Sequence, residues 1–215
     1  MRKIWNVTKL DFSLIKPYLK PILFVILFPI VFVALNRSLA VGISFAVYFA
    51  DLTTSYTFTV TEKNGMERMY GLLPVTKREA VMGRYLLIGI QGLIALAVSI
   101  IAQPLVLRAL GQTVLPVDIL MAAMGGMFLF ALYTAFQIPA YYKFGPIKGS
   151  WFLYVPGIIS LSLLWFLPEE WISNPIAGAN LPALLFLLVV ELALIALMYA
   201  VSIRCSVGIL EKKEF

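Results

Sequence analysis

Long apolar runs fill most of this 215-residue chain and leave it a narrow choice of folds. Hydrophobic residues make up 61% of the sequence, charged residues only 13%, and the mean hydropathy is +0.94. Such a chain has too little polar surface to cover a soluble globule. A bilayer core about 30 Å thick needs roughly twenty apolar helical residues for each crossing. The sequence therefore predicts an all-α polytopic membrane protein with six transmembrane helices and no separate soluble domain.

The six predicted crossings are separated by polar or proline-containing turns. We expect them at about residues 22–35, 39–60, 81–107, 119–141, 151–167 and 181–203, with a turn over 142–150. The first two form a hairpin, and Pro104 is expected to break or kink the far end of the third. The membrane domain is then 21–209, followed by a cytoplasmic tail over 210–215.

Residues 1–20 differ from the crossings because basic and apolar side chains are mixed along them. Lys3, Lys9 and Lys16 alternate with aliphatic and aromatic residues, which is typical of an amphipathic helix lying in the headgroup region. Trp5 and Tyr18 suit the membrane interface as anchors. The sequence thus predicts an N-terminal interfacial helix; a soluble leader is the alternative.

The basic residues are distributed very unevenly between the two sides of the predicted bundle. Only Arg37 and Arg108 fall on one side, whereas the other fifteen of the 17 Lys and Arg residues fall on the opposite side. Positive charge accumulates on the cytoplasmic side of membrane proteins. Both termini and the polar segment 61–80 are therefore expected in the cytoplasm of a cell-membrane protein. This topology explains the net charge of +6, and we expect no nucleic-acid partner.

The polar segment 61–80, TEKNGMERMYGLLPVTKREA, combines two helix signals. Met66, Met69, Tyr70 and Leu73 are spaced as i, i+3, i+4 and i+7, which predicts a short amphipathic helix over 62–73. Pro74 ends it, and the Thr76 to Glu79 spacing is that of a capping box that starts the next helix. The segment is either a docking surface or an ordinary loop whose Met and Tyr side chains rest on lipid.

Residues 62–86, EKNGMERMYGLLPVTKREAVMGRYL, and the ending RCSVGILEKKEF resemble the membrane-spanning subunits of ABC-2-type exporters. Within that group they are most similar to the membrane subunits of phenol-soluble modulin exporters. The resemblance implies that 62–73 is a coupling helix seated in a separate cytoplasmic ATPase, which binds ATP and Mg. It implies two permease copies, identical or closely related, in contact with membrane lipid. The implied docking residues are Glu62, Lys63, Gly65, Met66, Glu67, Arg68, Met69, Tyr70, Leu72, Leu73, Pro74, Thr76, Arg78 and Glu79.

Several kinds of chemistry are absent from the sequence itself. The chain has no histidine, and Cys205 is its single cysteine, so zinc or haem imidazole ligation, Ser-His catalysis and intrachain disulfides are excluded. No GxxxxGK[ST] phosphate loop occurs either. We therefore expect no enzyme activity, cofactor or metal site in this chain, and ATP hydrolysis by a partner.

Asp51 and Glu191 each lie well inside a predicted crossing, where a charged carboxylate is costly unless it is paired, hydrated or protonated. Either they line a translocation path, or they are structural. In the structural reading, Asp51 bonds to hydroxyls such as those of Thr53, Thr54 and Tyr199, or pairs with Arg84. The intramembrane amides of Gln91, Gln103 and Gln137 are expected to link helices, and Gln91 and Gln137 are also candidates for the path.

Together these features favour the permease half of an ATP-driven exporter for amphipathic or hydrophobic peptides, antimicrobial or toxin-like. Two other functions fit the sequence. One is a proton-coupled secondary transporter that uses Asp51 and Glu191. The other is a membrane protein of immunity or sensing that does not transport.

Overall fold

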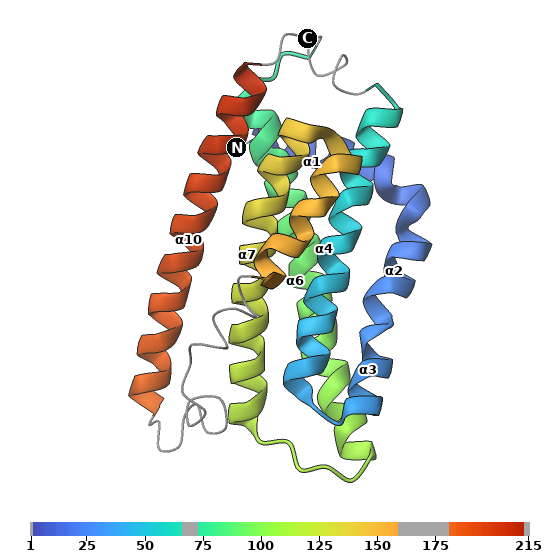
Figure 1. Cartoon of the computed structure of the whole chain (residues 1–215), viewed down its shortest axis with the longest axis vertical. Coiled ribbons are helices and arrows are strands. Elements are labelled where there is room, and N and C mark those ends of the chain that lie inside the picture. Colours follow the sequence, from blue (N-terminus) through green and yellow to red (C-terminus); the bar gives the residue numbers. More distant parts are fainter. Residues whose placement is uncertain (1, 66–72, 159–180, 213–215) are drawn as a thin grey trace.

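The computed structural model describes residues 2–65, 73–158 and 181–212, and every regular element within these ranges is a helix. This confirms the all-α prediction. Four long helices run side by side in Figure 1: α4 (Leu39–Lys63), α6 (Lys77–Ala109), α7 (Pro116–Gly149) and α10 (Leu181–Glu211). The most extensive contacts are those of α7 with α4 and α10, so α7 lies between them.

Within the described ranges, five helical stretches are long and apolar enough to cross a membrane: 2–36, 39–63, 77–109, 116–158 and 182–211. We predicted six. The difference arises at α7, which continues through the predicted turn at 142–150 and departs from helical geometry at Gly145 (φ 79°, ψ 172°). A positive φ of this kind favours glycine. Figure 1 shows the chain reversing there and running back along the bundle. Residues 159–167 of the predicted fifth crossing lie outside the described residues.

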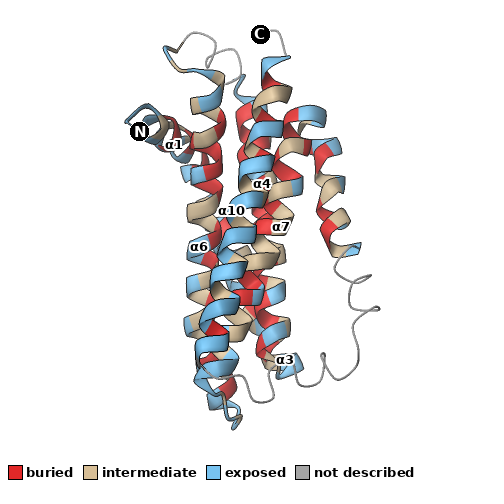
Figure 2. Ribbon diagram, turned by 90° about the vertical axis from the view of Figure 1, so that its left-hand side faces the viewer, coloured by how far each residue is buried: buried red, intermediate tan, exposed pale blue. Residues whose placement is uncertain are grey.

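The N-terminal region forms four short elements separated at prolines and a left-handed turn. They are α1 (Arg2–Ile15), η1 (Lys16–Tyr18), α2 (Leu19–Leu27) and α3 (Pro29–Asn36). Arg37 then adopts φ 51°, and the Ser38 hydroxyl caps α4. The predicted hairpin of the first two crossings is thereby confirmed as α3 followed by α4. Figure 2 places α1 beside α6 near one end of the bundle.

Close packing of α3, α4 and α6 depends on small and aromatic side chains. The Phe32 and Phe45 rings stack with centroids 4.2 Å apart. A Cβ on Gly42 would lie 1.8 Å from Val33 Cγ2 and 2.6 Å from Gln103 Oε1, so only glycine fits between the three helices. Pro104 is buried beside Gln103, and α6 continues past it to Ala109. Pro104 therefore does not break the helix, in which its missing N–H interrupts a single rung; a kink, the other predicted outcome, stays a prediction.

Hydroxyl groups join α10 to the bundle on its inner side. The Tyr85 hydroxyl lies 2.6 Å from Ser202 Oγ and 2.9 Å from Ser206 Oγ, and the Thr134 and Tyr199 hydroxyls are 2.9 Å apart. The outer side of α10 is apolar and exposed along its length (Figure 2). This asymmetry is typical of a helix that packs on protein with one face and on lipid with the other.

Candidate functional site

The start of α6 is capped as the sequence predicts, and we call residues 73–79, where the connection from α4 enters α6, the corner. The Thr76 hydroxyl accepts a hydrogen bond from the Glu79 amide at 3.2 Å, and the Glu79 carboxylate accepts one from the Thr76 amide at 2.9 Å. The predicted capping box is therefore confirmed. It satisfies two backbone donors that the helix itself leaves free, and so fixes where α6 begins.

Both terminal helices contact this corner. Lys3 Nζ, on α1, donates a hydrogen bond to the Pro74 carbonyl at 3.0 Å. Lys77 Nζ, in the first turn of α6, donates one to the Glu211 carbonyl at the end of α10, at 3.3 Å. The connection between α4 and α6 thus ends at a point that touches α1 and α10 together.

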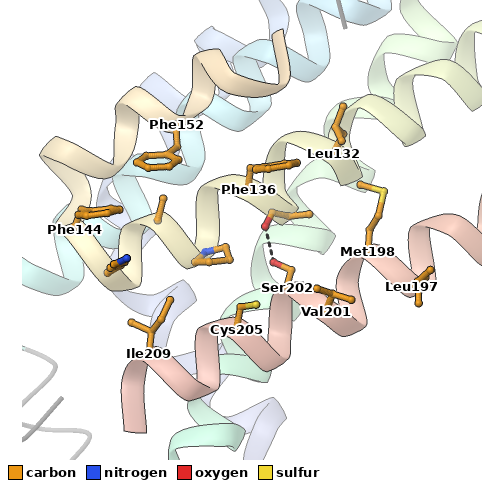
Figure 3. Close-up of a pocket in the computed structure, with 14 residues that line it drawn as sticks. Leu132, Phe136, Phe144, Phe152, Leu197, Met198, Val201, Ser202, Cys205 and Ile209 are labelled. Carbon is orange, nitrogen blue, oxygen red and sulfur yellow. Dashed lines mark hydrogen bonds between the residues drawn. The ribbon is translucent and has the colours of Figure 1, made fainter. Parts of the chain in front are cut away.

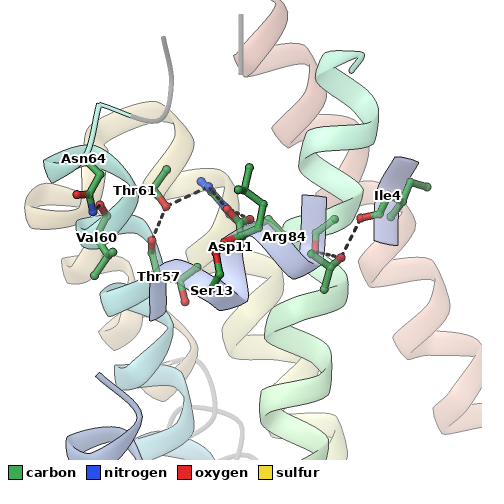
Figure 4. Close-up of polar contacts among 11 residues, drawn as sticks. Ile4, Asp11, Ser13, Thr57, Val60, Thr61, Asn64 and Arg84 are labelled. Atoms are coloured by element: carbon green, nitrogen blue, oxygen red, sulfur yellow. Dashed lines mark hydrogen bonds and ion pairs between the residues drawn. The ribbon is translucent and has the colours of Figure 1, made fainter. Parts of the chain in front are cut away.

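Three residues from three helices form a buried polar group just inside the corner, which we call the Arg84 cluster: Arg84, Asp11 and Thr61 (Figure 4). The Arg84 guanidinium lies 3.4 Å from each Asp11 carboxylate oxygen and donates to the Thr61 hydroxyl at 3.1 Å. Its carbon is 4.8 Å from the Phe58 ring centroid and 5.9 Å from that of Tyr142. Together with these rings, the cluster connects α1, α4, α6 and α7, and Thr61 lies two residues before Lys63, the last residue of α4.

A second contact, one helical turn from Asp11, holds α1 against α6. The buried Thr8 hydroxyl donates to the Gly83 carbonyl at 3.0 Å. A Cβ on Gly83 would stand 2.7 Å from Val7 Cγ1 and 3.2 Å from the Ile4 carbonyl. The absence of a side chain at Gly83 therefore allows α1 to approach this closely. Trp5 and Tyr18 remain exposed, as an interfacial anchor requires.

Sequence reasoning missed Asp11 as part of this site. It is the only acidic residue among the first fifty, and it shares a helical face with Val7, Thr8 and Ile15, all buried. A carboxylate on the apolar face of an amphipathic helix was the available signal, because such a group needs a cationic partner.

The predicted docking residues fall into three groups. Glu62 and Lys63 belong to the last turn of α4, not to a separate short helix, and Gly65 follows with φ 59°. Leu73, Pro74, Thr76, Arg78 and Glu79 lie in the described approach to α6 or in its first turn. The remaining docking residues lie outside the described residues: Met66, Glu67, Arg68, Met69, Tyr70 and Leu72.

A different kind of buried polar group lies deeper in the bundle, and we call it the Asp51 group: Asp51 on α4 with Gln137 and Tyr141 on α7. Asp51 and Gln137 are 0% exposed and Tyr141 is 2% exposed. Their side-chain polar atoms form no hydrogen bond with any residue that the structure describes. Asp51 lies within electrostatic range of the Tyr141 hydroxyl, and Gln137 and Tyr141 share one face of α7.

Asp51 is not hydrogen-bonded to any of the partners that we proposed, Thr54 included, and three of them are engaged elsewhere. Arg84 pairs with Asp11. The Thr53 hydroxyl donates to the Ala50 carbonyl and accepts from Gln91, and the Tyr199 hydroxyl pairs with Thr134. The structural interpretation of Asp51 is therefore wrong in these pairings, because α6 presents Arg84 to α1 near the end of the bundle.

Among the other intramembrane polar residues, some form hydrogen bonds between helices and some form none with the described residues. Gln91 joins α6 to α4 through Thr53, as predicted for a helix-linking amide. Gln103, like Gln137, forms no side-chain hydrogen bond within the described ranges. Glu191 is partly exposed on α10, and its Oε1 also has no described partner. Among the described residues, no three His, Cys, Asp or Glu side chains gather where a metal ion could bind.

Comparison with known protein families gives a match that covers nearly the whole chain. The family model described as ABC-2 family transporter protein matches residues 6–210. No curated protein and no solved structure matches the chain. The matched range includes both the corner before α6 and the Arg84 cluster.

Proposed function

Because the chain belongs to the ABC-2 family of transporter membrane proteins, we propose that it is the permease subunit of an ATP-driven exporter. A separate cytoplasmic ATPase supplies the energy and binds ATP and Mg, since this sequence has no phosphate loop. The corner before α6 is the observation that carries the proposal. It ends the polar connection between two membrane helices and touches α1 and α10 at once.

The docking surface in this proposal is the segment 62–73 at the end of α4. Its stripe of Met66, Met69, Tyr70 and Leu73 offers adaptable apolar side chains to a pocket of the ATPase. Motion of this segment reaches the bundle through two routes. One is Thr61 and the Arg84 cluster; the other is the capped start of α6. Both routes support coupling between ATPase movement and the membrane helices.

The working unit in this proposal contains two permease copies and two ATPases in the cell membrane, with both termini in the cytoplasm. The uneven distribution of Lys and Arg supports this orientation. The proposed subunit has six crossings, of which the fifth begins at 151–158. An even number of crossings places both termini on the same side of the membrane. Amphipathic or hydrophobic peptides are the proposed cargo, as in the phenol-soluble modulin exporters that the sequence resembles; the scarcity of charged residues in the bundle is compatible with such cargo.

The docking role is tested with a charge placed on the stripe. Leu73→Asp is expected to abolish co-purification with the neighbouring ATPase, because a carboxylate would have to enter an apolar pocket. Leu115→Asp is the matched control, since Leu115 is 62% exposed at the other end of the bundle, just before α7. Retained complex and normal hydrolysis with Leu73→Asp would refute docking through this segment.

A second candidate function rests on the Asp51 group. Asp51 is fully buried and has no hydrogen-bond partner among the described residues; a carboxylate inside a membrane bundle is typical of proton-carrying sites in secondary transporters. In that function, Asp51 and Glu191 bind and release protons during transport. Uptake or export by the purified chain in liposomes, driven by a pH gradient without any ATPase, would favour it over the exporter.

A further inference from the structure

An open groove runs along the outer side of the seam between α7 and α10. It has a volume of about 620 Å³ and is bounded at one end by the element η2 (Ser150–Leu153). In Figure 3, Phe136, Phe144 and Phe152 lie across the groove from Val201, Cys205 and Ile209. Ser202 donates to the Ala135 carbonyl at 2.7 Å and closes the floor.

The length of the groove along α7 is close to the thickness of one membrane leaflet. Its lining on α7 extends from Leu132 to Phe144, which at the helical rise corresponds to about 18 Å. Half of a bilayer core is about 15 Å. Several lining side chains are exposed at the outer surface of the bundle, where the surrounding medium is lipid. The shape therefore matches a single extended hydrocarbon chain that enters from the side.

One end of this apolar lining carries a positive charge. Lys143 is the only ionisable Lys, Arg, Asp or Glu residue among the groove's described lining, and it is exposed. Its ammonium group lies 5.1 Å from the Phe144 ring centroid, and Phe144 stacks on Phe152. Lys143 forms no ion pair with any residue that the structure describes. A cation at the level where the leaflet ends is placed to meet an anionic headgroup.

We propose that this groove binds one anionic phospholipid, with an acyl chain along α7 and α10 and the phosphate at Lys143. The apolar lining excludes free phosphate as the ligand, because the phosphate alone would leave the groove empty. The charge at Lys143 selects an anionic headgroup over a zwitterionic one. This site does not depend on the proposed exporter function, since it requires neither cargo nor ATPase.

Cys205 provides the readout, because it lines the groove, is exposed and is the chain's single cysteine. The full chain is reconstituted in phosphatidylcholine vesicles, with or without phosphatidylglycerol, and labelled with a neutral maleimide. Bound lipid shields the thiol. Phosphatidylglycerol is expected to slow labelling about five-fold, the ratio that one lysine near an anionic headgroup supplies.

Lys143→Gln is expected to remove this five-fold difference and to lose the phosphatidylglycerol adduct in native mass spectra. Lys148→Gln is the matched control, because Lys148 is exposed nearby and does not line the groove. This variant should keep the five-fold labelling difference and the phosphatidylglycerol adduct. Equal labelling of the unmodified chain in the two vesicle types overturns the proposal. Equal loss of the labelling difference in the Lys143→Gln and Lys148→Gln variants overturns it as well. Protection that rises with protein density, not with phosphatidylglycerol, also overturns it and assigns the groove to a second copy of the chain.

Discussion

The Arg84 cluster and the Asp51 group are both buried and polar, yet they are built in opposite ways. In the Arg84 cluster, each member contacts another across helices, and the cation also lies over aromatic rings. In the Asp51 group, the carboxylate, amide and hydroxyl are buried without a hydrogen bond to any described residue. A satisfied buried network favours one geometry. An unsatisfied polar group costs about 1–3 kcal/mol and calls for a specific explanation.

The contrast separates rigid and adjustable parts of the bundle. At the end near the corner, four helices are joined through one guanidinium, so that end favours a single arrangement. In the middle, α4 and α7 meet through polar atoms that form no hydrogen bond with the described residues. In the proposed exporter, a state in which water or cargo enters between these helices would satisfy them. The same kind of substitution should therefore change stability differently in the Arg84 cluster and in the Asp51 group.

The largest effect is expected from Asp11→Ala. It leaves the Arg84 guanidinium, 5% exposed, without its carboxylate, and removing one partner of a buried pair costs about 3–5 kcal/mol. The thermal unfolding midpoint in detergent should fall sharply. The double replacement Asp11→Leu with Arg84→Met should recover most of the loss, and Lys9→Ala, an exposed neighbour on α1, should have little effect. Equal stability of Asp11→Ala and the double variant would show that the pair carries no such coupling.

A backbone contact next to the cluster is tested by Gly83→Ala. The new methyl group would stand 2.7 Å from Val7 Cγ1, so α1 must shift, at a cost of about 1–3 kcal/mol in unfolding free energy. Gly89→Ala is the matched control in the same helix, because nothing lies within 4 Å of a Cβ there. That control should be neutral or should stabilise by up to about 1 kcal/mol. Similar thermal shifts for both variants would contradict close docking of α1.

Thr76→Ala removes the cap of α6 and leaves the Arg84 cluster intact. We expect a loss of about 1 kcal/mol, typical of an N-terminal cap. If the corner couples the ATPase to the bundle, cargo-stimulated hydrolysis should fall more than stability does. Thr76→Ser keeps the hydroxyl and should retain both the stability and the cargo-stimulated hydrolysis. A loss of stability with unchanged coupling would limit Thr76 to a structural role.

The smallest effect on stability is expected from Asp51→Asn. The substitution keeps the shape and removes only the charge, and Asp51 has no described partner to lose. The unfolding free energy should change by less than about 0.5 kcal/mol, whereas Asp11→Asn should be clearly destabilising. Measuring both variants side by side tests the comparison directly. A large loss with Asp51→Asn would mean that this carboxylate is paired after all.

Local features of the fold were predictable from the sequence, and long-range pairings were not. The Thr76 cap depends on residues three apart, and the hairpin at Arg37 on one short polar turn, so both could be inferred. The partner of Arg84 lies 73 residues away, and hydropathy along a chain contains no information about which faces meet. The sequence therefore left Arg84 as one possible partner of Asp51 beside the hydroxyls of Thr53, Thr54 and Tyr199. The turn near Gly145 was expected as a loop, but one glycine with positive φ is enough to redirect the helix.

The separation of 73 positions in the sequence between Asp11 and Arg84 also affects how the chain is made. At a synthesis rate of about 5–20 residues per second, Asp11 emerges roughly 4–15 s before its partner exists. During that interval its carboxylate must stay hydrated. An amphipathic α1 that waits in the headgroup region meets this need, because water reaches Asp11 there even though Asp11 lies on the face that later packs on α6. The ion pair then forms only when α6 inserts, which makes it a late step in assembly.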